Sequence, residues 1–262
     1  MRKAVLVSLR AVPIPHKATL VLLFAALVCL TGWGAPAWGQ AVDGAGGVGG
    51  VRSFGITSSY SPDSSRILIG EAEQRRIWTG GAEYTHRMHQ SQRVRWDYEG
   101  SFLPLYKESD PTLGGNFYTL PNGQTVVTRQ VPVRLTTVPR GPVSSEPTGN
   151  TSVPLYALLG RQNTNGVEFS PLGARISALP RRRVQPSFAL DLGIVATAHQ
   201  IPVDNADNFN FMFSFGPGVQ FFARRSSLRL EYIYRHISNA GLGYENPGID
   251  QGVVRLTLSR HW

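Results

Sequence analysis

The chain has 262 residues, of which 42% are hydrophobic and 16% are charged, and it contains 28 Gly and 18 Pro. This much apolar material excludes wholesale disorder, and so many helix-interrupting residues exclude a mostly helical protein. A single cysteine, Cys29, excludes an intramolecular disulfide framework and a cysteine-rich metal site. The formal net charge of +9 alone would suit a nucleic-acid partner.

The first 40 residues have the order of a secretory signal peptide. Residues 1–17 carry four basic and no acidic side chains, an apolar run follows from Ala18 to Leu30, and Ala37 and Gly39 supply the small residues of a cleavage site. The apolar run makes only about 20 Å of helix, which is too short to cross a bilayer comfortably. We therefore expect residues 1–40 to be removed, the alternative being an uncleaved N-terminal anchor.

Removal of the signal peptide changes what the charge implies. The four lost basic residues lower the net charge from +9 to +5, and the only cysteine leaves with them. An exported chain with this modest basic excess is not a candidate for binding nucleic acid, although the excess suits an anionic lipid surface. The Gly-rich residues 41–50 are expected to form a flexible lead-in.

The rest of the chain, 51–262, repeats a pattern with a period of two, which is typical of β-strands. In the clearest example, Leu228, Leu230, Tyr232 and Tyr234 alternate with Arg229, Glu231, Ile233 and Arg235. The alternation is also regular in 94–102, 188–197, 208–223 and 253–262, and less regular in 51–60, 66–88 and 166–179. The sequence therefore predicts an all-β protein with eight strands.

A soluble β-sandwich would also alternate, so the chemistry of the two faces must decide. In a small membrane barrel the apolar, aromatic-rich face contacts lipid, and the lumen holds polar and small side chains. Here the non-apolar faces mix small residues with paired charges such as Arg229 and Glu231, which suits a narrow, packed lumen. We expect an eight-stranded antiparallel transmembrane β-barrel.

The lengths of the connections between the strands agree with this prediction. Starting from the inner side of the membrane, the even connections should be short turns and the odd ones longer outer loops. The even connections, at about 88–92, 180–183 and 224–227, are short, whereas the odd ones cover about 62–65, 107–165, 200–208 and 239–250. Only the first loop, at 62–65, is brief for its class, and 107–165 is expected to be a long outer loop.

The chain ends on Trp262, which closes an alternating strand. A terminal aromatic residue is common in exported barrels as a recognition element for the outer-membrane assembly machinery. We expect that machinery to be a partner and the outer membrane of a Gram-negative-type bacterium to be the location. Nothing in the sequence sets an oligomeric state.

Chemistry-bearing residues gather after the strand at 228–237. The sequence continues His236-Ile237-Ser238-Asn239-Ala240-Gly241, and Asn246, Gly248 and Asp250 follow. At this point, over roughly residues 228–250, the chain resembles the lipid A 3-O-deacylase family of outer-membrane barrels. The resemblance implies a serine esterase that removes an ester-linked acyl chain from the lipid A of lipopolysaccharide, with no metal or organic cofactor.

The resemblance also implies roles for individual residues. Ser238 would be the nucleophile, His236 its base and Asp250 the acid that orients the base. The family's acid is usually Glu, so Asp250 is a departure, and its shorter side chain puts its reach to His236 in question. The Asn-containing loop would help stabilise the oxyanion, and its candidates are Asn239, Gly241 and Asn246.

The strand pattern supports this site independently. His236 and Ser238 are two residues apart, so they share a face with the lipid-facing series that ends at Tyr234. Unpaired polar groups in hydrocarbon are costly, and a serine needs a base with an orienting partner to become nucleophilic. Asp250 begins the next strand and can return beside them. A catalytic triad at the outer end of the barrel is therefore predicted.

Two alternatives stay open. The chain could be a non-enzymatic small barrel (an adhesin, porin-like protein or scaffold) with 107–165 as its working part, or a deacylase relative that has lost activity at Asp250. His86 and His89 are expected to be interfacial rather than metal ligands, and Asp204 and Asp207 to lie in a solvated outer loop. The charges at 229, 231 and 235 are expected to form a structural network in the lumen.

Overall fold

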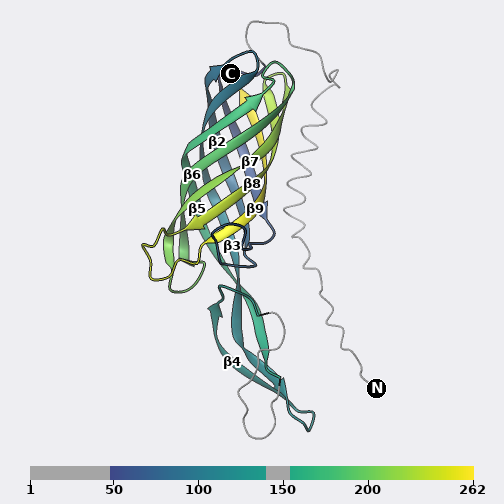
Figure 1. Cartoon of the computed structure of the whole chain (residues 1–262), viewed down its shortest axis with the longest axis vertical. Helices are drawn as coiled ribbons and strands as arrows, with labels where there is room; N and C mark the ends of the chain where they lie inside the picture. Colours follow the sequence, from purple (N-terminus) through teal and green to yellow (C-terminus); the bar gives the residue numbers. More distant parts are fainter. Residues whose placement is uncertain (1–47, 140–153) are drawn as a thin grey trace, which may run out of the picture. The chain divides into compact units, whose positions relative to one another are not determined.

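A computed structural model describes residues 48–139 and 154–262 of the chain. Within these ranges the regular structure consists of antiparallel strands (Figure 1). They are β1 (Arg52–Ser61), β2 (Arg76–Gln90), β3 (Val94–Thr119), β4 (Thr125–Arg134), β5 (Tyr156–Ala178), β6 (Val184–Ile201), β7 (Asp207–Ala223), β8 (Ser226–Ser238) and β9 (Ile249–His261). No helix in the described residues is long and apolar enough to cross a membrane. The predicted signal peptide and lead-in residues 41–47 lie outside the described residues.

Eight of these strands close into a ring, which confirms the predicted barrel. Each pairs with its neighbour along the chain, except that β3 pairs with β5, and β9 returns to pair with β1. The closing register joins Ser53 to His261 and Tyr60 to Val254, residues that lie about 200 positions apart. Closure removes the free edges of the sheet, so every barrel strand has a neighbour on both sides.

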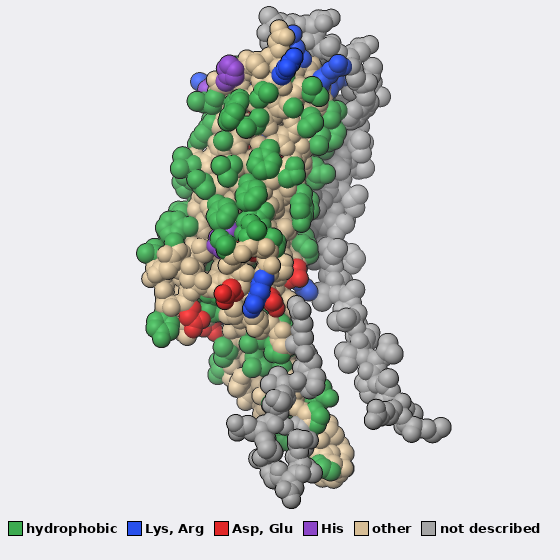
Figure 2. Space-filling view, viewed as in Figure 1, with side chains coloured by type: hydrophobic (Ala, Val, Ile, Leu, Met, Phe, Trp, Pro, Cys, Tyr) green, Lys and Arg blue, Asp and Glu red, His purple; other side chains and the backbone are tan. Residues whose placement is uncertain are grey.

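The two faces of the wall have the predicted chemistry. On β8 the side chains of Leu230 and Tyr232 are 49% and 63% exposed, whereas those of Arg229 and Glu231 between them are buried in the lumen. Figure 2 shows hydrophobic side chains spread over the barrel wall, with charged side chains gathered towards its two ends. An apolar outer wall around a charged interior is the arrangement of a transmembrane barrel and the reverse of a soluble one.

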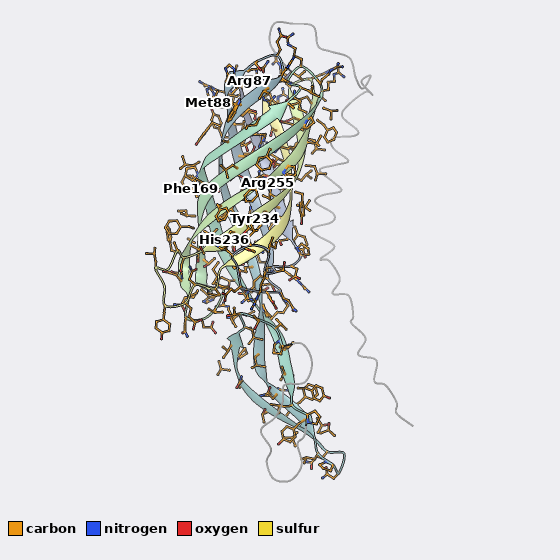
Figure 3. All side chains as sticks on the ribbon, in the orientation of Figure 1. Arg87, Met88, Phe169, Tyr234, His236 and Arg255 are labelled. Carbon is orange, nitrogen blue, oxygen red and sulfur yellow. The ribbon has the colours of Figure 1, made fainter. Side chains whose placement is uncertain are left out.

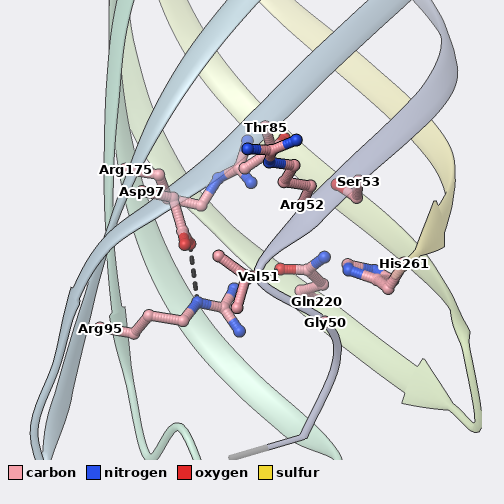
Figure 4. A pocket seen from close by; sticks show the side chains of 10 residues that line it. All are labelled: Gly50, Val51, Arg52, Ser53, Thr85, Arg95, Asp97, Arg175, Gln220 and His261. Carbon is pink, nitrogen blue, oxygen red and sulfur yellow. Dashed lines mark hydrogen bonds and ion pairs between the residues drawn. The ribbon is translucent and has the colours of Figure 1, made fainter.

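Ion pairs fill the lumen. Glu231 lies 2.6 Å from Arg255 Nε and 3.0 Å from Arg229 Nε, and Arg229 also contacts Glu83 and Glu99. Near the end with the short turns lies a cavity of only about 10 Å³. It is lined by side chains that come from several strands, among them the paired Arg95 and Asp97 in Figure 4. That volume holds about one water molecule. Arg229 and Glu231 of the predicted charge network are therefore paired, whereas Arg235 pairs with Glu168 at 3.2 Å instead.

The connections confirm the predicted alternation of short turns and longer loops, with one correction. Short turns join β2 to β3, β5 to β6 and β7 to β8, all at one end, which we call the inner end. The first connection at the opposite, outer end is not brief: β2 begins at Arg76, so the loop covers residues 62–75. The prediction of a strand from residue 66 was wrong. The backbone of this loop bonds to residues 247–250, which end the β8–β9 loop and begin β9, instead of continuing the ladder between β1 and β2. The bonds run from Ser65 to Asp250, from Glu71 to Pro247 and from Ala72 to Gly248.

The region expected as a long outer loop contains much β-structure. Strand β3 continues beyond its pairing with β2, and its Thr112–Thr119 segment pairs with β4 and with the first residues of β5 (Figure 1). The β-branched run in Thr125–Arg134 favours a strand even among many turn-forming neighbours. The rings of Phe117 and Tyr156 stack with centroids 5.1 Å apart across this extension. We call the part formed by 112–134 and 156–161 the outer extension.

Replacing residues 115–130 with an Asn-Gly turn should leave the barrel able to fold. Within the described residues β4 pairs with β3 alone, so the eight-stranded ring is complete without it, and loop length itself costs little. The check is gel mobility: folded protein should still migrate differently before and after boiling. A matched deletion that removes Leu135 and Thr136 should reduce the folded band, because their carbonyls accept hydrogen bonds from the buried Arg75. Loss of the folded band in the first variant would make the outer extension part of the barrel.

Candidate active site

His236 and Asp250 face each other across two neighbouring strands at the outer end of the barrel. His236 is near the end of β8 and Asp250 is the second residue of β9, and the register places them directly opposite. Directly opposite residues have Cβ atoms about 4.5–5.5 Å apart, so short side chains can meet. The His236 Nδ1 atom lies 2.7 Å from Asp250 Oδ1. The shorter aspartate therefore reaches the imidazole, which answers the question raised by the departure from Glu.

The carboxylate of Asp250 is buried and has hydrogen-bond donors on both oxygens. Oδ1 also accepts the hydroxyl of Tyr234 at 2.7 Å, and Oδ2 accepts the backbone N–H groups of Leu68 and Ile69 at 2.6 and 2.9 Å. Because an ionised carboxylate can only accept hydrogen bonds, Nδ1 of His236 must carry the hydrogen atom and be the donor to Oδ1. The Nε2 atom is then left with the lone pair of a base.

Sequence reasoning missed three of these four donors. Tyr234 had a signal, because it lies two residues before His236 on the same face of β8 (Figure 3). Leu68 and Ile69 act through their backbone, which no side-chain pattern reveals. Ile69 of their loop, 62–75, lines the same groove as His236, which is only 6% exposed although it belongs to the outward-facing series.

Ser238 lies at the end of β8 on the same face and is half-buried. It and His236 line a groove of about 400 Å³ whose other lining residues are Ile69, Leu192, Gly193, Phe211, Met212 and Phe213. The Phe213 ring packs against the imidazole with centroids 5.2 Å apart. A hydroxyl and a base therefore share an apolar groove, which suits an acyl chain better than a polar ligand.

The three predicted oxyanion residues lie in the loop between β8 and β9. The amide of Asn239 is buried within this loop: its Nδ2 donates to the Glu245 carbonyl at 2.8 Å, and its Oδ1 accepts the Gly241 N–H at 2.9 Å. Asn246 accepts the Asn239 N–H through Oδ1 at 3.0 Å, which leaves its Nδ2 as a donor. Asn239 and Gly241 thus hold the loop in shape, and Asn246 is the member of the set whose donor group is not used for this.

Gly248 brings the end of this loop against the imidazole. Its φ of +62° lies in the left-handed region, where side chains are strained. A Cβ at this position would also lie 2.9 Å from Cε1 of His236. The glycine therefore lets the chain pass the histidine and enter β9 in the register that delivers Asp250.

The remaining candidates lie away from this site. His86 and His89 are near the inner end of β2, opposite the end that carries His236. Asp204 pairs with Arg134 at 3.0 Å in the outer loops, and Asp207 accepts the N–H of Phe209. Among the described residues, no three His, Cys, Asp or Glu side chains are grouped so that they could hold a metal ion.

Comparisons with known proteins agree with the motif. Residues 133–259 match the model of the family described as lipid A 3-O-deacylase (PagL). No curated protein matches the chain.

Solved structures that resemble the chain are remote in sequence. The crystal structure of the outer membrane enzyme PagL is 12% identical, with a TM-score of 0.43, over 78% of this chain and 97% of that chain. The outer membrane protein OprG from Pseudomonas aeruginosa is 11% identical, with a TM-score of 0.37, over 82% and 99%. The COG4313 outer membrane channel from Pseudomonas putida F1 is 10% identical, with a TM-score of 0.25, over 88% and 100%.

The matched stretch begins in β4 and ends in β9, and it includes His236, Ser238 and Asp250. Over residues 133–259 this chain is therefore similar to the lipid A 3-O-deacylase family.

Proposed function

We propose that this protein is an outer-membrane serine esterase that removes an ester-linked acyl chain from the lipid A of lipopolysaccharide. The observation that carries the proposal is the contact of 2.7 Å between His236 and Asp250 beside the groove that Ser238 lines. The match of residues 133–259 to the family model supports the substrate class. The groove lies at the outer end of an apolar wall, at the level where acyl chains meet the headgroup.

The reaction follows the logic of an activated serine. The Oγ atom of Ser238 bonds to the acyl carbonyl carbon while Nε2 of His236 takes the hydroxyl proton. The negative charge that develops on the carbonyl oxygen is stabilised by donors of the β8–β9 loop, with Asn246 Nδ2 as the side-chain candidate. The ester C–O bond then breaks, and the sugar oxygen leaves with the proton from His236. Water attacks the acyl-serine in the same way and releases the fatty acid.

Asp250 orients and stabilises the base in each step of this reaction. As an anion hydrogen-bonded to Nδ1, it fixes the tautomer of His236 and stabilises the imidazolium that forms in each step. It does not need to take the proton itself. This is the role that the resemblance implied for it.

Delivery to the outer membrane is part of the proposal. The signal peptide at 1–40 would direct export, and the strand that ends at Trp262 would be read by the assembly machinery. Trp262 is 58% exposed, and its backbone exchanges two hydrogen bonds of 3.0 Å with Arg52 of β1, which closes the ring. The last strand read by the machinery would thus also be the strand that completes the barrel.

Mass spectrometry of lipid A tests the proposal directly. Lipid A from cells that express this protein should lose the mass of one ester-linked acyl chain relative to cells without it, and a free fatty acid should be released. Identical lipid A from both, with the protein folded in the outer membrane, would reject the esterase. The outer extension, where Val131 is 82% exposed, would then be the working part of a non-enzymatic barrel.

Asp250→Glu should lower deacylation rather than improve it. The carboxylate already meets His236 at 2.7 Å, and an added methylene would push it by about 1.5 Å towards the backbone of Leu68 and Ile69. A displacement of this size at an orienting group predicts a loss of about ten- to a hundredfold. The measurement is fatty-acid release from lipopolysaccharide in detergent, with Asp204→Glu as the control. A gain in activity would mean that Asp250 is held too far from its base.

A further inference from the structure

The first outer loop, 62–75, wraps around the residues that enter β9. The backbone N–H of Ser65 donates to the Asp250 carbonyl at 3.1 Å, and the N–H of Ala72 donates to the Gly248 carbonyl at 3.0 Å. Single bridges also pair Ser64 with Gln251 and Ala72 with Ile249. The loop is therefore bonded to the backbone on both sides of Asp250. The loop contacts the carboxylate of Asp250, while the backbone of Asp250 is held in the sheet.

The donors divide the two carboxylate oxygens of Asp250 between them. Oδ2 is occupied by the N–H groups of Leu68 and Ile69, and Oδ1 receives Nδ1 of His236 and the hydroxyl of Tyr234. A carboxylate on a short side chain can rotate, and either oxygen could meet the imidazole. Two backbone donors on Oδ2 and a phenol on Oδ1 fix one rotation, in which Oδ1 faces His236.

Gly70 makes this close approach possible. A Cβ on Gly70 would lie 2.6 Å from the backbone N of Asp250 and 2.8 Å from both its Cγ and its Oδ1. These distances are too short for real Cβ contacts, and the atoms in the way are backbone and a fixed carboxylate. The glycine is thus needed for space directly above the acid.

The end of the loop is held by the buried side chain of Arg75. Arg75, whose side chain is fully buried, donates to the carbonyls of Glu73 at 2.6 Å, Pro202 at 2.9 Å and Thr136 at 3.0 Å, and it also contacts Leu135. Its Nε atom lies 3.5 Å from Asp110 of β3. One guanidinium therefore joins the loop to three other outer segments, so the loop can impose a position on Asp250 rather than follow it.

We propose that residues 68–70, together with Tyr234, form a positioning clamp that holds Asp250 in the one orientation that serves His236. The inference rests on the proposed esterase and deepens it by assigning a role to the first outer loop. None of these residues touches the reacting atoms in this mechanism. They act through the acid, and removing the acid removes their effect.

A double-mutant cycle tests this coupling. Gly70→Ala should lower kcat about tenfold because it displaces the acid, and any change in KM would report on Ile69, the neighbouring residue that lines the groove. Gly80→Ala is the matched control, because a Cβ there meets only side chains at 3.5 Å or more. In an Asp250→Ala background, Gly70→Ala should cause no further loss. The same factor in both backgrounds would mean a general structural effect and would overturn the clamp.

A second readout does not depend on catalysis. With ¹⁵N-labelled histidine in detergent micelles, the proton shared by His236 Nδ1 and Asp250 should give a downfield resonance, assigned by its absence in His236→Gln. Gly70→Ala should remove or shift this resonance, and Gly80→Ala should keep it. Tyr234→Phe, which removes one hydroxyl from the outward face and leaves the ring, should shift it even if Gly70→Ala fails to fold.

The two proposals fail in different ways. A wild-type resonance in both Gly70→Ala and Tyr234→Phe would overturn the clamp while leaving the esterase in place. Full activity in Ser238→Ala would overturn the esterase, whereas the resonance would still report whether the loop positions Asp250.

Discussion

Ser238→Ala should abolish deacylation, with a fall in kcat of at least about a thousandfold, because the variant has no nucleophile to form the acyl-enzyme. His236→Ala should be comparably severe, since Ser238 then has no base. The double variant should be no worse than either single one, because residues that act as one unit are strongly non-additive. The measurement is the rate of fatty-acid release from lipopolysaccharide by purified protein in detergent.

Folding must be unchanged for this result to carry weight. Ser238 is the last residue of β8 and is half-buried, so the loss of one hydroxyl should leave gel mobility before and after boiling as in the wild type. Ser58→Ala is the matched control, because Ser58 is also an outward hydroxyl on a barrel strand, bonded to the Thr79 carbonyl at 3.1 Å. If Ser238→Ala retained wild-type activity, the assignment of the nucleophile would be wrong.

Glu231→Gln should strongly destabilise the barrel without touching the site. The Glu231 carboxylate is buried in the lumen between Arg229 and Arg255, with Arg175 3.8 Å away. Neutralising the Glu231 carboxylate removes one negative charge from beside three buried guanidinium groups. Breaking a buried ion pair by removing one member costs about 3–5 kcal/mol.

The free energy of unfolding in urea, measured with the protein folded into lipid vesicles, checks this prediction. The midpoint for Glu231→Gln should fall well below that of the wild type. Glu71→Gln, in an exposed part of the first outer loop, should leave the midpoint nearly unchanged. An unaltered midpoint for Glu231→Gln would show that the lumen charges contribute shape rather than electrostatic stability.

Local rules explain why so much of the barrel was predictable from the sequence. Alternation with a period of two depends only on neighbouring residues, and in β8 it correctly separated Leu230 and Tyr232 on the wall from Arg229 and Glu231 in the lumen. The short even connections placed the inner turns where the structure has them. His236 and Ser238 share a face for the same local reason, and Asp250 follows closely enough in the chain for a hairpin to bring it back opposite His236.

The outer extension shows where local rules stopped. Its Gly, Pro and Thr residues favoured a loop, yet 125–134 pairs with 112–119 because β3 continues past the barrel and offers a free edge. Such pairing depends on where the partner strand ends, which the residues of 125–134 do not encode. The β-branched run inside this segment was the available signal.

The eight barrel strands, their two faces and the motif that carries His236, Ser238 and Asp250 were predictable from the amino-acid pattern alone, because each depends on residues that are close in the chain. The place of the loop 62–75 at the site became visible in the folded barrel alone, where the N–H groups of Leu68 and Ile69 bond to a carboxylate some 180 residues away. Every residue except proline carries the same backbone donor, so no composition or spacing marks the two that are used. Closure of β1 against β9 brings them there, and closure is a property of the whole barrel.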